Sequence, residues 1–240
     1  MFQLLSQIDV LNIRANVLGF LLKTKVSKCN NFSCLINLSY AFGQNLTRFM
    51  ENGTIDPFQI KEEILQLIKI LAKRQIRTAL EIGTANGGTL FLFSHIFSQD
   101  ALIASVDLPG GRFGGGYESW KTSFYKSFAL PKQKLYLIRG DSHSDKTANI
   151  VKNIFHNKNL DFLFIDGDHA YEGAKSDFET YSKLVRPGGL IAFHDIVSGL
   201  PESVGGVPKF WNQIKNDFRH RKLSMIGIKA AMELGFSFPE

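Results

Sequence analysis

The sequence predicts an α/β fold with a doubly wound, mostly parallel sheet, an antiparallel C-terminal hairpin and an N-terminal helical extension. Two observations predict it. From Arg77 onward, short apolar runs alternate with segments of helical period. The runs lack polar alternation, which is typical of parallel strands covered by helices on both faces. We therefore divide the chain into the extension, residues 1–56, and the α/β domain, residues 57–240.

The expected strands of the parallel sheet are short apolar runs separated by helical segments. We place strands at 78–82, 102–106, 135–138, 162–165 and 190–193, and helices at 89–97, 118–128, 147–155 and 208–218. A further helix between the last two strands is expected to stop at Pro187-Gly188-Gly189. Residues 223–228 and 234–238 are the expected hairpin.

The extension is expected to hold two or three helices, because Leu4, Leu5, Ile8 and Leu11 follow helical spacing. These helices form either a lid over the ligand cleft or a face that binds a partner. The first helix of the α/β domain is expected to start at Asp56-Pro57. Asp is a favoured N-cap residue, and Pro is favoured at the first helical position.

Bulk composition limits the classes of function. The chain has 240 residues, 44% hydrophobic content and net charge +6, without a run of five Lys or Arg. Nucleic-acid binding is therefore not expected. No segment is long and uncharged enough to span a membrane, and the N-terminus lacks the features of a signal peptide. We expect a cytoplasmic protein, with Cys29 and Cys34 as free thiols in a reducing compartment.

Acidic residues stand at the ends of the five expected parallel strands. The carboxyl ends of parallel strands meet at one edge of a sheet, where ligands of such folds bind. One Asp in such a place is usually a helix cap, but five in register indicate a ligand site. Buried carboxylates cost stability unless hydroxyls, amides or cations satisfy them. The five residues are Glu81, Asp107, Asp141, Asp166 and Asp195.

A glycine-rich loop follows the first strand, Gly83-Thr84-Ala85-Asn86-Gly87-Gly88. Its spacing is not that of the dinucleotide loop, so alone it is a weak signal. Small residues let the backbone approach an adenosine closely, and Asp107 stands where a carboxylate takes ribose hydroxyls. Glu81 would repel a phosphate, and there is no phosphate-loop Lys. These residues favour an adenosine ligand without phosphates.

Three segments, EIGTANGGT, VDLPGGRFGGG and IDGDHAYEG with RPGGLIAFHDI, resemble class I S-adenosylmethionine-dependent methyltransferases, whose fold is Rossmann-like. The resemblance is greatest to a bacterial subgroup related to macrolide-sugar O-methyltransferases and cephalosporin hydroxylase-like proteins, and it covers roughly residues 57–238. It implies S-adenosylmethionine as cofactor. The cofactor residues that it implies are Glu81, Gly83 and Gly87 in the loop, Asp107 at the ribose, and Asp141 with Ser142 near the adenine.

The resemblance also implies a metal site and a base. Asp166, His194 and Asp195 would hold Mg²⁺ or another divalent metal, and His169 would be the catalytic base. His194 stands where relatives carry a carboxylate, and because Mg²⁺ prefers oxygen, a softer metal is an alternative. An imidazole accepts protons near neutral pH, which suits His169 to deprotonating an acceptor hydroxyl.

The implied activity is O-methylation of a small hydroxylated or sugar-containing metabolite. Two alternatives stay open: a cephalosporin hydroxylase-like enzyme on the same fold, and a catalytically silent fold that binds a partner protein through its N-terminal helices. A nicotinamide-dependent oxidoreductase is least favoured, because the loop lacks the required glycine spacing. The oligomeric state is open, with a homo-oligomer among the options.

Overall fold

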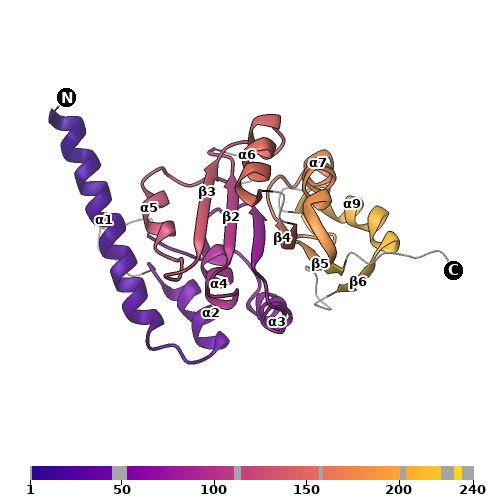
Figure 1. Ribbon diagram of the computed structural model, residues 1–240, viewed down its shortest axis with the longest axis horizontal. Coiled ribbons are helices and arrows are strands. Elements are labelled where there is room, and N and C mark those ends of the chain that lie inside the picture. Colours follow the sequence, from indigo (N-terminus) through magenta and orange to yellow (C-terminus); the bar gives the residue numbers. More distant parts are fainter. Residues whose placement is uncertain are drawn as a thin grey trace.

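The computed structural model describes residues 2–44, 53–110, 115–156, 159–200, 204–222 and 230–233. Its seven described strands form one sheet in the order β3-β2-β1-β4-β5-β7-β6 (Figure 1). β1 to β5 run parallel to one another, whereas β7 is antiparallel to both of its neighbours, β5 and β6. The strands are β1 (Thr78–Ile82), β2 (Leu102–Asp107), β3 (Lys134–Arg139), β4 (Leu160–Ile165), β5 (Val185–Phe193), β6 (Arg219–Lys222) and β7 (Ala230–Glu233).

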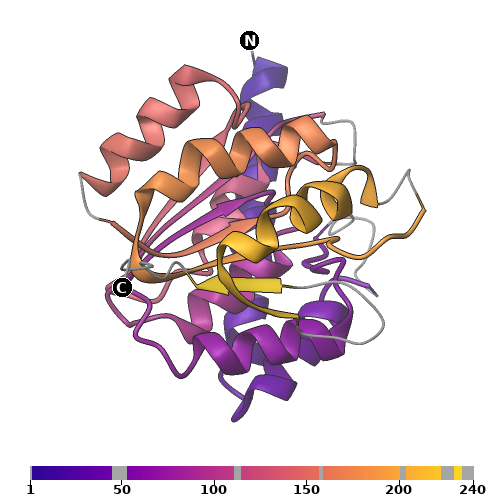
Figure 2. The same ribbon diagram turned by 90° about the vertical axis from the view of Figure 1, so that its right-hand side faces the viewer.

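Helices lie on both faces of the sheet, which confirms the predicted α/β class. In the view of Figure 2, α6, α7 and α9 lie above the sheet and α3 and α4 lie below it. The α-helices are α1 (Phe2–Val26), α2 (Phe32–Ala41), α3 (Lys61–Leu71), α4 (Gly88–Ile96), α5 (Lys121–Lys126), α6 (Asp145–Phe155), α7 (Tyr171–Tyr181) and α9 (Val207–Ile214).

Strand residues alternate between two buried clusters, one on each face. On β4, Phe162 and Phe164 pack with the residues of α1 to α5, whereas Leu163 and Ile165 pack with those of α6, α7 and α9. This alternation follows from the two-residue period of a strand. It explains why the parallel strands read as unbroken apolar runs.

The N-terminal helices share the core of the α/β domain. Leu18 of α1 and Ile36 of α2 belong to the same buried cluster as the apolar residues of α4. The segment after α2 passes over the start of α4, where a Cβ on Gly88 would lie 2.2 Å from the Ile55 carbonyl oxygen. Gly88 therefore allows the extension to pack against the beginning of this helix. The division of the chain at residue 56 stays a prediction.

Two element boundaries differ from those predicted. α3 begins at Lys61 rather than at Asp56-Pro57. The Asp56 carboxylate instead accepts a hydrogen bond from the Phe58 amide (2.8 Å), which closes a turn before the helix. Similarly, Pro187-Gly188-Gly189 lies inside β5 and does not end a helix. The β4–β5 register shifts at this point, so the irregular residues are accommodated as a bulge.

Two further differences concern short segments. α5 covers Lys121–Lys126, fewer residues than the predicted 118–128. The predicted hairpin segments, 223–228 and 234–238, lie outside the described residues. The antiparallel pair that the structure does describe, β6 and β7, comes immediately before each of them.

The expectation of free thiols is wrong, because Cys29 and Cys34 form a disulfide. The bond closes the turn between α1 and α2. Asn31 caps α2 by accepting a hydrogen bond from the Cys34 amide (2.8 Å), which folds the chain back. This turn brings the two Cα atoms to 5.4 Å, a separation that a disulfide spans.

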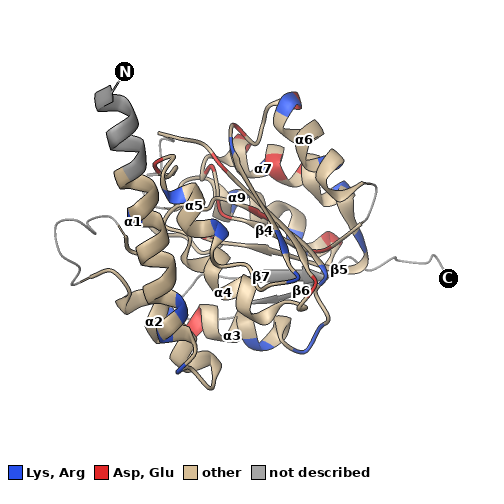
Figure 3. Ribbon diagram, turned by 60° about the vertical axis from the view of Figure 1, so that its left-hand side comes forward, with Lys and Arg blue, Asp and Glu red and all other residues tan. Residues whose placement is uncertain are grey.

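None of the described helices combines the length and the apolar character needed to cross a membrane. Lys and Arg are spread over separate elements, among them α3 and α6 (Figure 3). Nucleic-acid binding is not tested by this distribution, and its expected absence stays a prediction.

Phe93 on α4 tests the packing of the lower layer. Its ring meets Phe162 and Phe164 edge-on at 5.3 and 5.5 Å between centroids. Phe93→Ala should lower the free energy of unfolding by about 3–5 kcal/mol, measured by urea denaturation, because it leaves a cavity. Phe20→Ala on α1 is the matched control: this side chain is 71% exposed, so its loss should stay within about 0.5 kcal/mol. Equal losses would contradict the packing described.

Candidate functional site

One cavity of about 650 Å³ lies at the carboxyl edge of the parallel strands. Loops after β1 to β5 form most of its wall, and the segment before α3 forms the rest. The lining residues are 56–59, 82–86, Thr89, 106–108, Gly115, 140–143, 166–170, His194 and Asp195. The predicted strand-end cluster therefore surrounds a single cavity, with the exception of Glu81.

Glu81 lies beneath the cavity rather than in its wall. It is 2% exposed, and its carboxylate accepts hydrogen bonds from the hydroxyls of Thr89 (2.6 Å) and Ser105 (2.5 Å). Burial raises the pKa of Glu81 from 4.5 to about 8, although the two hydroxyls oppose the shift. Its position suits it to fixing the glycine loop between β2 and α4.

Two glycines of this loop are required by packing. At Gly83, φ is +97° and a Cβ would lie 2.0 Å from the Asp166 carbonyl oxygen. At Gly87, φ is +76° and a Cβ would lie 2.9 Å from the Tyr125 ring. Gly83 lines the cavity and Gly87 does not. Both residues allow the loop to lie closely against its neighbours, in a backbone conformation that favours glycine.

Asp107 bridges two loops at the end of β2. One carboxylate oxygen accepts a hydrogen bond from the Ala85 amide (2.6 Å), and the other accepts one from the Gly116 amide (2.9 Å). The residue is 5% exposed, and burial raises the pKa of its carboxyl against the effect of these amides. Each oxygen has a second lone pair, so Asp107 can still accept hydrogen bonds from a ligand.

The loop after β3 forms another part of the wall, with Asp141, Ser142 and His143. The Asp141 carboxylate accepts a hydrogen bond from the His143 amide (2.9 Å). The Ser142 carbonyl accepts one from the Tyr181 hydroxyl of α7 (2.7 Å). The predicted adenine-side pair therefore lies on a loop that α7 anchors from behind.

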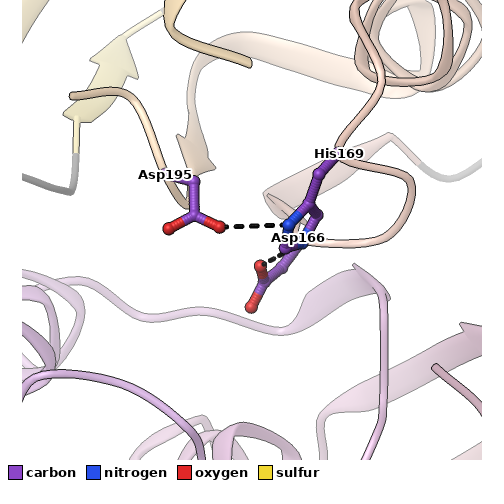
Figure 4. Close-up of side chains that lie close together, drawn as sticks. All are labelled: Asp166, His169 and Asp195. Atoms are coloured by element: carbon purple, nitrogen blue, oxygen red, sulfur yellow. Dashed lines mark ion pairs between the residues drawn. The ribbon is translucent and has the colours of Figure 1, made fainter. Parts of the chain in front are cut away.

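Two aspartates and two histidines meet where β4 and β5 end, and we call them the Asp–His cluster: Asp166, His169, His194 and Asp195. His194 Nδ1 lies 3.0 Å from a carboxylate oxygen of each Asp. His169 points between the same two carboxylates, with Nδ1 3.2 Å from Asp195 and Nε2 3.6 Å from Asp166 (Figure 4). Burial would raise the pKa of Asp166, but the neighbouring histidines hold it well below its usual range.

The cluster fits a divalent cation. Ligand atoms of Asp166, His169 and Asp195 all lie within 4.8 Å of one another. Two carboxylate oxygens and an imidazole nitrogen suit a transition metal better than Mg²⁺, which prefers oxygen alone. This ligand set includes His169, which the sequence predicts as the base, and does not include His194, which the sequence predicts as a metal ligand. The roles of these four residues stay predictions.

A family model described as a methyltransferase domain matches residues 80–196, the segment from β1 to just beyond β5. Over these residues the chain is similar to methyltransferase domains. An uncharacterized protein of Acanthamoeba polyphaga mimivirus is 30% identical over 138 residues. That match covers 58% of this chain and 60% of the relative, which is less than two thirds of its length.

Solved structures share the fold. The calicheamicin methyltransferase CalS11 has a TM-score of 0.57 at 12% identity and covers 93% of this chain and 92% of its own. The O-methyltransferase TomG from Streptomyces achromogenes gives 0.50 at 16%, with coverages of 87% and 92%. The mycinamycin-pathway methyltransferase MycE gives 0.51 at 17%, with coverages of 87% and 56%. At these identities the likeness concerns the fold alone.

The cavity wall includes a polar residue that sequence reasoning missed. Gln59, 7% exposed, donates a hydrogen bond from Nε2 to Asp166 (2.8 Å). Its own carbonyl accepts a hydrogen bond from the Tyr40 hydroxyl of α2, and its buried Oε1 has no hydrogen-bond partner among the described residues. No motif marks this glutamine, because its role depends on how the extension folds over the sheet.

Replacement of Glu81 should change how stability depends on pH. A carboxyl whose folded pKa exceeds its unfolded value stabilises the fold most at low pH, and this contribution is lost as pH rises from 4.5 toward 8. The free energy of unfolding of Glu81→Gln, taken relative to that of the parent protein, should therefore be larger at pH 8 than at pH 5. The difference should be at least about 1.4 kcal/mol, which corresponds to one pKa unit. Urea denaturation at each pH measures this difference.

The control for this experiment is Glu172→Gln on α7, whose side chain is 81% exposed. It should leave the pH dependence of the parent protein unchanged. A Glu81→Gln protein whose stability relative to the parent is the same at pH 5 and pH 8 would contradict the raised pKa.

Proposed function

We propose that this protein transfers the methyl group of S-adenosylmethionine to a hydroxyl of a small acceptor. The observation that carries the proposal is the continuity of the cavity. Asp107 and the glycine loop stand at one part of its wall, and the Asp–His cluster stands at another. A cofactor bound at the first part would share one cavity with an acceptor bound at the second.

The charge of the cavity supports this cofactor. The described residues that line it include six aspartates and neither Lys nor Arg. An acidic wall favours a cationic sulfonium and disfavours a polyphosphate. In the proposed arrangement, Asp107 accepts hydrogen bonds from the ribose hydroxyls, Asp141 and Ser142 lie beside the adenine, and Gly83 admits the chain of the cofactor.

The chemistry proposed is an in-line displacement at the methyl carbon. The acceptor oxygen forms a bond to this carbon as the sulfur–carbon bond breaks, and the sulfur keeps the electron pair, giving S-adenosylhomocysteine. Alignment of the two reactants supplies much of the rate. A divalent cation, held by Asp166, Asp195 and one of the histidines, would lower the pKa of the acceptor hydroxyl.

His169 is the proposed base in this reaction. Its ring lies between Asp166 and Asp195, whose charges stabilise the imidazolium that forms when it takes the hydroxyl proton. Gln59 donates a hydrogen bond from Nε2 to Asp166, and its Oε1 has no hydrogen-bond partner among the described residues, so Oε1 can accept a hydrogen bond from the acceptor.

A hydroxylated or sugar-containing metabolite is the proposed class of acceptor. Phe58 lines the cavity with its side chain 66% exposed, so an apolar portion of an acceptor can pack on its ring. The MycE structure is a complex with Mg, S-adenosylhomocysteine and mycinamycin VI, and TomG is described as involved in tomaymycin synthesis. These neighbours support the proposals that the acceptor is a metabolite and that a divalent cation assists the reaction.

One observation favours a second candidate, a hydroxylase on the same fold. The Asp–His cluster offers two imidazoles and a carboxylate, a ligand set that suits non-haem iron in oxygenases. Oxygen consumption after addition of Fe²⁺ would distinguish this activity from methyl transfer.

Asp107→Ala tests the cofactor half of the site. The variant should bind S-adenosylhomocysteine at least about tenfold more weakly, which corresponds to a loss of about 1.4 kcal/mol, because the ribose hydroxyls lose their acceptor. Isothermal titration calorimetry measures the affinity. The exposed Asp100→Ala is the control and should match the parent protein. Absence of binding to the parent protein would refute the proposed function.

Mn²⁺ tests the metal half, with no acceptor required. The parent protein should bind Mn²⁺, and Asp195→Asn should weaken this binding at least about tenfold, since a carboxylate ligand becomes neutral. Electron paramagnetic resonance of free Mn²⁺ gives the affinity, and Asp100→Asn serves as the control. If Asp195→Asn and the parent protein bind Mn²⁺ equally, the Asp–His cluster is not the metal site.

A further inference from the structure

A buried carboxylate on α7 stands outside the roles assigned so far. Asp177 is 0% exposed and lies behind two loops that line the cavity. Its Oδ1 faces His143 of the loop after β3, 3.4 Å from Nε2. Its Oδ2 faces the loop after β4, 3.5 Å from where a Cβ on Gly167 would lie. A charge so deeply buried destabilises a protein unless an opposite charge compensates it.

His143 supplies that opposite charge. Three carboxylates face its ring: Asp177 from α7, Asp141 from its own loop (3.8 Å from Nδ1), and Asp168 from the loop after β4. The contact with Asp177 is the main reason that the pKa of His143 rises from 6.5 to about 9, against the opposing effect of burial. His143 is therefore an imidazolium at neutral pH, although its side chain is still 29% exposed toward the cavity.

A second contact joins the same helix to the same loop. Tyr181 lies one turn after Asp177 on α7 and donates a hydrogen bond to the Ser142 carbonyl (2.7 Å). Residues four apart share one face of a helix. This face of α7 therefore holds two consecutive residues of the 141–143 loop. Tyr181 holds Ser142 by a hydrogen bond, and Asp177 holds His143 by an ion pair.

We propose that Asp177 is a positioning residue for the cofactor: through its ion pair with His143 it holds the 141–143 loop where that loop forms the cavity wall. This inference rests on the proposed function, because it assigns the 141–143 loop to the cofactor. Asp177 itself touches no ligand in this account. It acts through His143, whose neutralisation would leave the Asp177 charge buried and uncompensated.

The ion pair makes cofactor affinity depend on pH in a defined direction. A histidine with a raised pKa contributes fully below its ordinary pKa, and its contribution is lost as pH rises through the folded value, here about 9. Affinity for S-adenosylhomocysteine should therefore fall between pH 8 and pH 10. In Asp177→Asn there is no ion pair to lose, so this part of the pH dependence should disappear.

The experiment is calorimetric titration of S-adenosylhomocysteine into the full-length protein between pH 6 and pH 10. The variants are Asp177→Asn, His143→Gln and the double variant. The amino group of the ligand also titrates in this range, so each profile is read as a difference from His143→Gln. We expect the parent protein to lose affinity several-fold more than the variants between pH 8 and pH 10. All three variants should have flatter profiles, because each lacks the ion pair. Asp177→Asn and the double variant should bind with similar, reduced affinity, whereas His143→Gln should bind no better than these two, since it leaves the Asp177 carboxylate buried without its partner.

Tyr181→Phe is the matched control on the same face of α7. It removes the other contact with the loop, so it should weaken binding yet keep the pH dependence of the parent protein. If Asp177 only supported the fold, Asp177→Asn would behave like this control: it would weaken binding and keep the pH dependence of the parent protein. An Asp177→Asn protein with an unchanged pH profile, or single-variant effects that add in the double variant, would overturn the proposal.

A second readout needs no ligand. The nuclear magnetic resonance signal of His143, assigned by its loss in His143→Gln, should titrate near pH 9 and shift down by more than one pH unit in Asp177→Asn. A parent His143 that titrates near 6.5 would overturn the ion pair directly. If this signal behaves as expected but S-adenosylhomocysteine does not bind, the proposed function fails while the pairing of Asp177 with His143 stands.

Discussion

The neutralisation of buried carboxylates at one edge of the sheet is the constraint on which the rest of this structure depends. Five parallel strands bring acidic residues to that edge. Asp141 is exposed, but the other four are largely shielded from water and need partners within the protein. Hydroxyls bind Glu81, backbone amides bind Asp107, and imidazoles stand between Asp166 and Asp195. Ser105 comes from β2 and Thr89 from α4, whereas the amides and imidazoles come from the loops, so these contacts join the loops of the cavity wall to the sheet.

The groups that bind the carboxylates differ between the two ends of the cavity, and each end therefore suits a different chemistry. Backbone amides leave Asp107 able to accept further hydrogen bonds, which suits a ligand rich in hydroxyls. The Asp–His cluster places two imidazoles beside two carboxylates, a set of groups that suits acid–base chemistry or a transition metal. The proposed methyl transfer uses both ends at once, since the cofactor and the acceptor must meet in line.

The sequence predicts the parts of this arrangement that depend on local pattern. The apolar runs and the acidic residues that follow them place β1 to β5 and the five strand ends, because period and topology alone decide their positions. Gln59 and Asp177 escape prediction, because Gln59 reaches the site from the segment before α3 and Asp177 reaches it from α7, behind the loops that line the cavity. The start of α3 and the disulfide escape it for a similar reason. At Asp56 a hydrogen bond from the Phe58 amide closes a turn where the sequence suggests the start of a helix. At Asn31 a helix cap turns the chain back, which brings together two cysteines that the sequence suggests are free.

A crystal structure of the protein with S-adenosylhomocysteine would test the central claim, that one acidic cavity holds cofactor and acceptor together. The account predicts ribose hydroxyls within hydrogen-bond distance of Asp107, the adenine against the 141–143 loop, and the sulfur facing the Asp–His cluster. A ligand bound elsewhere, or a sulfur turned away from His169, would contradict it.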